Sequence, residues 1–178
     1  MSDLVKIAKT EISNSNKLCV IAGLNVLEDD QLTFEVAERL KKITEAQGNS
    51  FIFKASFDKA NRSSVDSYRG PGLEKGLEIF RELKKSDYQL ITDIHEISQV
   101  EQISEVVDII QIPAFLCRQT DLIKEACQSG KPLNIKKGQF LSPDQMKNII
   151  EKCSNFGNDQ IMLCERGTSF GYDNLVVD

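Results

Sequence analysis

The sequence contains no apolar run of the roughly 18 residues that a membrane-spanning helix needs. Its beginning, MSDLVKIAKTEISNSNK, also lacks the apolar stretch that is typical of a signal peptide. We therefore expect a cytoplasmic protein that does not associate with membranes.

The sequence also has no excess of basic over acidic residues. The chain has 22 Lys and Arg residues against 27 Asp and Glu residues, and its formal net charge is -5. Because surfaces that bind nucleic acids usually carry a positive excess, we expect no nucleic-acid partner. Small phosphorylated ligands remain possible, since they require only a local cluster of positive side chains.

The cysteines form no C-x-x-C pair, and their number is odd. This spacing argues against a zinc site and against a disulfide framework. We interpret them as buried free thiols of a reducing compartment. They are Cys19, Cys117, Cys127, Cys153 and Cys164.

Short apolar runs alternate along the chain with longer segments of helical period, and neither a repeat nor a linker interrupts them. The predicted strands are 18–22, 51–56, 90–94, 109–112, 133–136 and 161–164. The predicted helices are 31–45, 73–85, 100–106, 120–127 and 143–153. Six such β/α units, with strands apolar on both faces, predict one α/β domain over residues 1–178 with a parallel sheet. Both an eight-stranded barrel and an open doubly wound sheet fit this pattern.

Polar side chains stand near the carboxyl ends of the predicted strands. Because side chains alternate between the two faces of a strand, Lys54 lies opposite the apolar residues that meet the helices, and should point inward. A charge in such a place is costly unless it is paired or contacts a ligand, and one inward lysine alone could belong to a structural ion pair. The whole set is Asn25, Lys54, Ser56, Asp93, His95, Gln111, Asn134, Lys136 and Arg166.

Such residues near the ends of six successive strands indicate a site, because α/β proteins build their sites at that end. The cations Lys54, Lys136 and Arg166 outnumber the one clear carboxylate, Asp93. A positive pocket in an acidic protein predicts an anionic ligand with phosphate or carboxylate groups.

The segment after the second predicted strand reads FDKANRSSVDSYRGPG. Its donors suit phosphate oxygens and sugar hydroxyls, although a solvated polar loop would have a similar composition. The donors are Lys59, Asn61, Arg62, Ser63, Ser64 and Arg69.

Several long motifs, in matching order and spacing, extend a family resemblance from about Lys17 to Asp178. They are KASFDKANRSS, SYRGPGLEKGL, ITDIHE, IIQIPAFLCRQTDL, NIKKGQF and CERGTSFGYDNLVVD. The sequence resembles the 3-deoxy-manno-octulosonate 8-phosphate synthases, also called 2-dehydro-3-deoxyphosphooctonate aldolases. The resemblance implies a TIM-type (β/α) barrel and a transferase that condenses phosphoenolpyruvate with D-arabinose 5-phosphate and releases phosphate. The product supplies the inner sugar of lipopolysaccharide, or a plant cell-wall sugar. A related aldolase that uses erythrose 4-phosphate is a weaker alternative, because the ANRSS segment matches the arabinose-phosphate enzymes better.

The resemblance also implies roles for single residues. Phosphoenolpyruvate would be held by Lys54, Ser56, Lys59, Gln111, Lys136 and Arg166. Arabinose 5-phosphate would be held by Asn61, Arg62 and Ser63, with Asp93 near its hydroxyls. His95 would orient the site, and Arg118 would reach across a subunit interface of a homo-oligomer, a tetramer in this family.

Asn25 stands where the metal-dependent members of the family have a cysteine ligand. Because an amide is a poor metal ligand beside a thiolate, we predict no required metal and no other cofactor. Asn25, Lys59, Asp93 and His95 are the predicted catalytic residues.

The family's barrel has two further β/α units, which carry a histidine and two acidic side chains of its site. We therefore expect about six of eight β/α units here, in an incomplete barrel whose own activity is uncertain. The alternative is a catalytically inactive barrel remnant that serves as a ligand- or partner-binding module.

Overall fold

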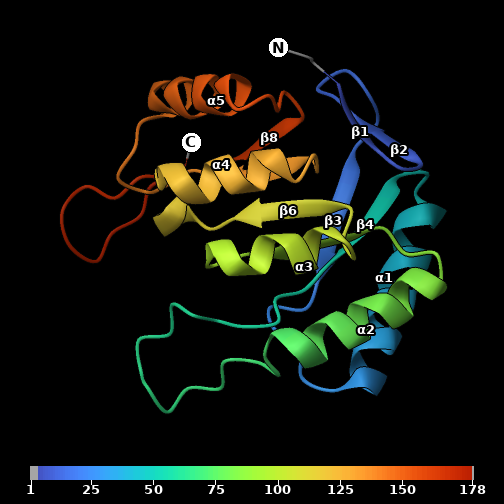
Figure 1. Cartoon of the computed structure of the whole chain (residues 1–178). Coiled ribbons are helices and arrows are strands. Elements are labelled where there is room, and N and C mark those ends of the chain that lie inside the picture. Colours follow the sequence, from blue (N-terminus) through green and yellow to red (C-terminus); the bar gives the residue numbers. More distant parts are fainter. Residues whose placement is uncertain (1–3, 178) are drawn as a thin grey trace.

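The structure is a computed structural model that describes residues 4–177. Its main sheet has six parallel strands in chain order, each paired with the next. The sheet curls into a half-barrel whose outer face is covered by helices (Figure 1). The predicted incomplete TIM-type barrel is confirmed. The strands are β3 (Cys19–Gly23), β4 (Ser50–Lys54), β5 (Leu90–Asp93), β6 (Ile109–Ile112), β7 (Leu133–Lys136) and β8 (Ile161–Cys164).

Each main strand from β3 to β7 is followed by helical structure, as the alternating pattern predicts. The predicted helix 100–106 begins at Val100 as expected but ends early, at Ser104, and a 3-10 turn with a capping box between Glu96 and Gln99 precedes it. Ser142 and Pro143 start the last helical segment, as predicted, again through a 3-10 turn. The helices are α1 (Asp30–Ala46), α2 (Leu73–Lys85), α3 (Val100–Ser104), α4 (Thr120–Gln128) and α5 (Met146–Asn155); the 3-10 turns are η1 (Ile97–Gln99), η2 (Ala114–Leu116) and η3 (Pro143–Gln145).

Two apolar clusters show which way the strand residues point. The larger lies between the sheet and the helices and includes Phe53 of β4 and Ile135 of β7. The smaller lies on the concave side and includes Ile52, Ile91 and Ile109. Since alternate residues of a strand share a face, the side chain of Lys54 points to the same concave side as that of Ile52, as the sequence predicts.

A two-stranded antiparallel hairpin precedes the half-barrel and is absent from the sequence-based prediction. Its strands are β1 (Val5–Ile7) and β2 (Thr10–Ile12). Val5 and Ile7 pack against the smaller apolar cluster, near the amino ends of the main strands. In Figure 1 the hairpin lies at the end of the sheet opposite to the loops that follow β4 and β8. It therefore covers the end of the half-barrel that is away from the predicted site.

All five cysteines are free thiols, but only Cys117, Cys127 and Cys153 are buried. Cys19 and Cys164 are partly exposed because they lie in β3 and β8, the two outer strands of the described sheet. The prediction of buried thiols is therefore wrong for these two. Within residues 4–177, no helix combines the length and the apolar character that crossing a membrane would require.

Candidate anion-binding site

A cavity of about 700 Å³ opens at the carboxyl ends of the strands. Its wall combines residues from the segments after β3, β4, β5, β6 and β8 with the last residues of β5 and β7. The structure thus brings together eight residues that the sequence analysis singled out. They are Asn25, Lys59, Asn61, Arg62, Asp93, His95, Lys136 and Arg166.

Part of the wall was not predicted. Residues 113–116, which contain η2, lie directly after β6 and contribute apolar surface, including the exposed ring of Phe115. Glu96 adds a carboxylate beside His95. The position of PAFL directly after a predicted strand is a signal for such a wall segment, but its apolar composition is also that of a core segment.

Lys54 lies at the inner end of this cluster of cations. Burial is the main cause that lowers the pKa of its ammonium group to about 8, with Asp93 acting against this shift and the charges of Lys136 and Lys59 adding to it. Burial likewise lowers the pKa of Lys59. Cations that are held this close together and partly desolvated are stabilised by any bound anion.

Asp93 is the buried carboxylate of the site, with 6% of its surface exposed. Burial acts to raise its pKa, but a hydrogen bond with His95 and the charge of Lys54 hold that pKa well below its usual range. Its Oδ2 is 3.4 Å from Nε2 of His95. The His95 ring in turn packs edge-on against Phe57, with centroids 5.5 Å apart. Asp93 is therefore an anion that balances part of the positive charge.

Two buried polar atoms in this region have no hydrogen-bond partner among residues 4–177. They are Oδ1 of Asp93 and Nδ1 of His95. Buried polar atoms are nearly always paired, so two unpaired atoms at the wall of one cavity are suited to a polar ligand.

Five residues with a predicted catalytic or substrate-binding role do not line this cavity, and three of them lie close beneath its wall. Lys54 points inward, as described above. Ser56 is buried, and its Oγ accepts a hydrogen bond from Nζ of Lys59 at 2.7 Å. Gln111 is buried too, and its Oε1 accepts from Nδ2 of Asn134 at 3.2 Å. Ser56 and Gln111 therefore support the wall from behind. The other two residues are Ser63 and Arg118.

Ser63 is exposed in the segment between β4 and α2, whose base is fixed to the rest of the protein. The backbone N–H of Lys59 donates to the carbonyl of Arg69 at 2.6 Å, and the Tyr68 hydroxyl donates to the carbonyl of Leu27 at 2.9 Å. The Arg69 guanidinium is engaged by Asp58, with Nε and Oδ1 2.8 Å apart. Arg69 is therefore not a free phosphate donor, whereas Lys59 is held in place at the cavity.

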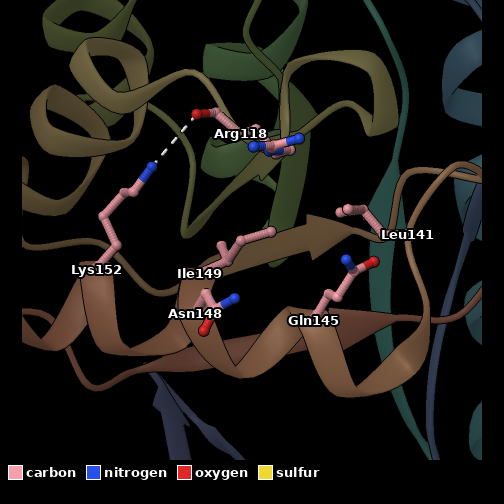
Figure 2. A pocket seen from close by; sticks show the side chains of 6 residues that line it. All are labelled: Arg118, Leu141, Gln145, Asn148, Ile149 and Lys152. Atoms are coloured by element: carbon pink, nitrogen blue, oxygen red, sulfur yellow. Dashed lines mark hydrogen bonds between the residues drawn. The ribbon is translucent and has the colours of Figure 1, made fainter.

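Arg118 lines a separate, smaller pocket of about 180 Å³ beside α5, together with Gln145, Asn148 and Lys152 (Figure 2). Nζ of Lys152 donates to the Arg118 carbonyl at 3.3 Å. Within one chain, Arg118 thus lies outside the main cavity, and a role across a subunit interface stays a proposal.

Within the described range 4–177, no cluster of three or more His, Cys, Asp and Glu side chains is arranged to hold a metal ion. Asn25 lines the cavity from the segment after β3. The wall combines amides and cations with the carboxylates of Asp93 and Glu96 and the imidazole of His95.

The fold and this site define a class: a β/α-barrel protein with a cation-rich cavity at the carboxyl ends of its strands. The chain belongs to the DAHP synthetase I family, whose sequence profile matches residues 4–178. It is similar to the 2-dehydro-3-deoxyphosphooctonate aldolases, as the motifs predict.

The identity is 54% with the enzyme of Haemophilus influenzae and 55% with that of Bdellovibrio bacteriovorus, each over 176 residues. The alignments cover 98% of this chain, but only 62% and 61% of the respective relatives. The aldolase of Pasteurella multocida is also 55% identical, and 62% of its length is covered. The chain thus spans about 62% of the length of the curated relatives that it matches.

Proposed function

We propose that the chain is part of an enzyme that condenses phosphoenolpyruvate with D-arabinose 5-phosphate to give 3-deoxy-manno-octulosonate 8-phosphate and phosphate. The observation that carries this proposal is the charge of the cavity. Lys59, Arg62, Lys136 and Arg166 line the cavity and outnumber its carboxylates, Asp93 and Glu96, in a protein whose net charge is -5. Two multiply anionic substrates require such a site, and the similar aldolases support the choice of reaction.

In this proposal, phosphoenolpyruvate binds in the inner part of the cavity, close to Lys54, Lys136 and Arg166. Lys59, which is oriented by Ser56, completes the set of cations. These groups neutralise the carboxylate and the phosphate, so that a second anion can approach the enol carbon.

Arabinose 5-phosphate then binds toward the segment after β4, with Asn61, Arg62 and Ser63 at its phosphate. Oδ1 of Asp93, which has no partner among residues 4–177, is placed to accept a hydrogen bond from a sugar hydroxyl. The enol carbon attacks the aldehyde, water adds to the carbon that bears the phosphate, and the C–O bond to that phosphate breaks. His95 holds Asp93 in place throughout.

We further propose that residues 1–178 belong to a single barrel domain of a cytoplasmic homotetramer. Arg118 would contribute to the site of a neighbouring subunit, which fits its position outside the cavity of its own chain. The product would serve lipopolysaccharide biosynthesis.

The proposed reaction is tested by phosphate release from the protein expressed from its full reading frame. We expect release when phosphoenolpyruvate and arabinose 5-phosphate are both present, and none when either is omitted. Release with erythrose 4-phosphate instead would assign the protein to the alternative condensation. No release with either sugar phosphate would refute the proposal.

Lys54 should make phosphoenolpyruvate binding depend on pH. Because its pKa is about 8, Lys54 is mostly charged at about pH 7.5 and mostly neutral at about pH 9. The affinity should fall about eightfold between about pH 7.5 and about pH 9, since only the charged fraction binds the anion well. Titration calorimetry at the two pH values measures this change. A Lys54→Met variant should bind more weakly but with a flatter pH dependence, and a wild-type affinity that stays constant would contradict the role of Lys54.

Removal of metal ions should leave the reaction unchanged, because Asn25 occupies the position of a possible thiolate ligand. The measurement is the rate of phosphate release before and after dialysis against a strong chelator. A rate that collapses and returns on addition of a divalent metal would show that this prediction is wrong. An Asn25→Cys variant, assayed in parallel with and without zinc, tests whether the site gains a metal response.

A further inference from the structure

Lys137 is a fully buried lysine that the sequence analysis did not assign to the site. It follows the last residue of β7, and only 2% of its surface is exposed. Neighbouring residues of an extended segment point to opposite sides, so Lys136 lines the cavity while Lys137 points away from it. The backbone N–H of Lys137 donates to the carbonyl of Cys164 at 2.9 Å, which continues the pairing of β7 with β8.

The ammonium group of Lys137 is surrounded by oxygen atoms of the segment that follows β8. It donates to the carbonyl of Gly167 at 2.7 Å and to Oγ1 of Thr168 at 3.3 Å. A third hydrogen bond goes to the carbonyl of Leu141 at 3.0 Å, and Oε1 of Glu165 lies 3.4 Å away. These partners offset the cost of burying the charge.

The partners of Lys137 flank Arg166 on both sides. Oε1 of Glu165 also accepts hydrogen bonds from the backbone N–H groups of Arg166 at 2.9 Å and of Gly167 at 2.6 Å. The backbone from Glu165 to Gly167 is therefore fixed by one carboxylate and one ammonium group.

The other side of this segment is fixed as well. Thr168 and Val176 exchange two backbone hydrogen bonds, of 2.7 and 2.9 Å. Gly167 adopts a φ of +84°, and a Cβ at this position would lie 2.6 Å from the carbonyl oxygen of Val176. The path of the segment leaves little freedom for the backbone of Arg166.

We propose that Lys137 is a positioning residue that sets the place of the Arg166 guanidinium in the cavity. It acts through the Lys137 clamp, by which we mean its ammonium group together with its contacts to Glu165, Gly167 and Thr168. This inference rests on the proposed function in one respect, namely that Arg166 binds phosphoenolpyruvate.

The first test of the clamp needs no ligand. Trypsin cleaves after Arg166 and after Arg62, which lies in an exposed segment far from Lys137 in the sequence. In a Lys137→Met variant, we expect cleavage after Arg166 to accelerate severalfold relative to cleavage after Arg62, as followed by mass spectrometry. Equal acceleration at both sites would indicate general unfolding, and no acceleration would indicate that the segment does not depend on Lys137. Either result would overturn the proposal.

The second test is a double-mutant cycle on phosphoenolpyruvate affinity in the full protein. Lys137→Met alone should weaken binding about tenfold, by the same factor as Arg166→Ala. In the Arg166→Ala background, the same change should have an effect of less than about twofold, because its target is already gone. A purely structural lysine would lower the affinity by the same factor in both backgrounds, which would overturn the positioning role.

A second variant serves if Lys137→Met does not fold, as judged by circular dichroism. Glu165→Ala removes the partly exposed carboxylate of the clamp. It should accelerate cleavage after Arg166 relative to cleavage after Arg62. It should also weaken phosphoenolpyruvate binding in the wild-type background more than in the Arg166→Ala background. Wild-type protein that binds no phosphoenolpyruvate would refute the proposed function, and the cleavage ratio alone would then decide on the clamp.

Discussion

Replacing Arg166 or Lys136 by alanine is expected to weaken phosphoenolpyruvate binding about tenfold or more in each case. Both side chains line the cavity and are only partly exposed. Each substitution removes a charge-assisted contact worth roughly 1.5–3 kcal/mol, and about 1.4 kcal/mol corresponds to a factor of ten. Titration calorimetry on the full protein measures the effect.

Lys147→Ala provides the matched control for these two variants. Lys147 is an exposed cation of α5 that pairs with Asp144 at the surface, so its loss should leave the affinity unchanged. If the Arg166 and Lys136 variants also bind as the wild type does, neither residue belongs to the site.

Replacing Phe57 by alanine is expected to lower the free energy of unfolding by about 3–5 kcal/mol. Phe57 is 1% exposed, although it lies in a segment that reads as a polar loop. Its side chain packs against Gly76 of α2, where a Cβ would lie only 2.5 Å from the Cβ of Phe57. The substitution thus leaves a cavity between the segment and α2, and also removes the ring that contacts His95.

Urea unfolding measures this loss, with Phe170→Ala as the matched control. Phe170 is 66% exposed, so its truncation should change the stability by less than about 0.5 kcal/mol. A loss for Phe57→Ala that is no greater than for Phe170→Ala would show that the ring does not anchor the segment. A Phe57→Leu variant, which keeps most of the volume, should be destabilised less.

The order of strands and helices could be predicted because local signals mark each element. The predicted bounds of α2, β6, β7 and β8 coincide with those observed. Pro113 ends β6, and Gly72, with a φ of +85°, precedes α2. The inward direction of Lys54 could be predicted from the alternation of a single strand.

Features that depend on contacts distant in the sequence could not be predicted in this way. The strands β1 and β2 have three residues each, too few to show a period, and they are stabilised by packing on residues of later strands. Alternation along the strand separates Lys136 from Lys137, but the buried hydrogen bond of Lys137 to the carbonyl of Gly167 joins residues 30 positions apart and leaves no local signal. The hydrogen bond from Arg69 to Asp58 could not be predicted either, because it forms only when the segment folds back and brings these two residues together.

The β1–β2 hairpin has a consequence for the order in which the protein folds. The backbone N–H of Lys6 donates to Oε1 of Gln160, a residue 154 positions further along the chain, at 2.8 Å. Contacts of such separation close very long loops, and they form late because the entropy of closure is lost before any contact compensates for it. During synthesis, the contacts of the hairpin with Gln89 and with the apolar residues of β4, β5 and β6 can form first, whereas the bond from Lys6 must wait until Gln160 has left the ribosome. A residue made at the very start of the chain therefore makes one of its contacts among the last.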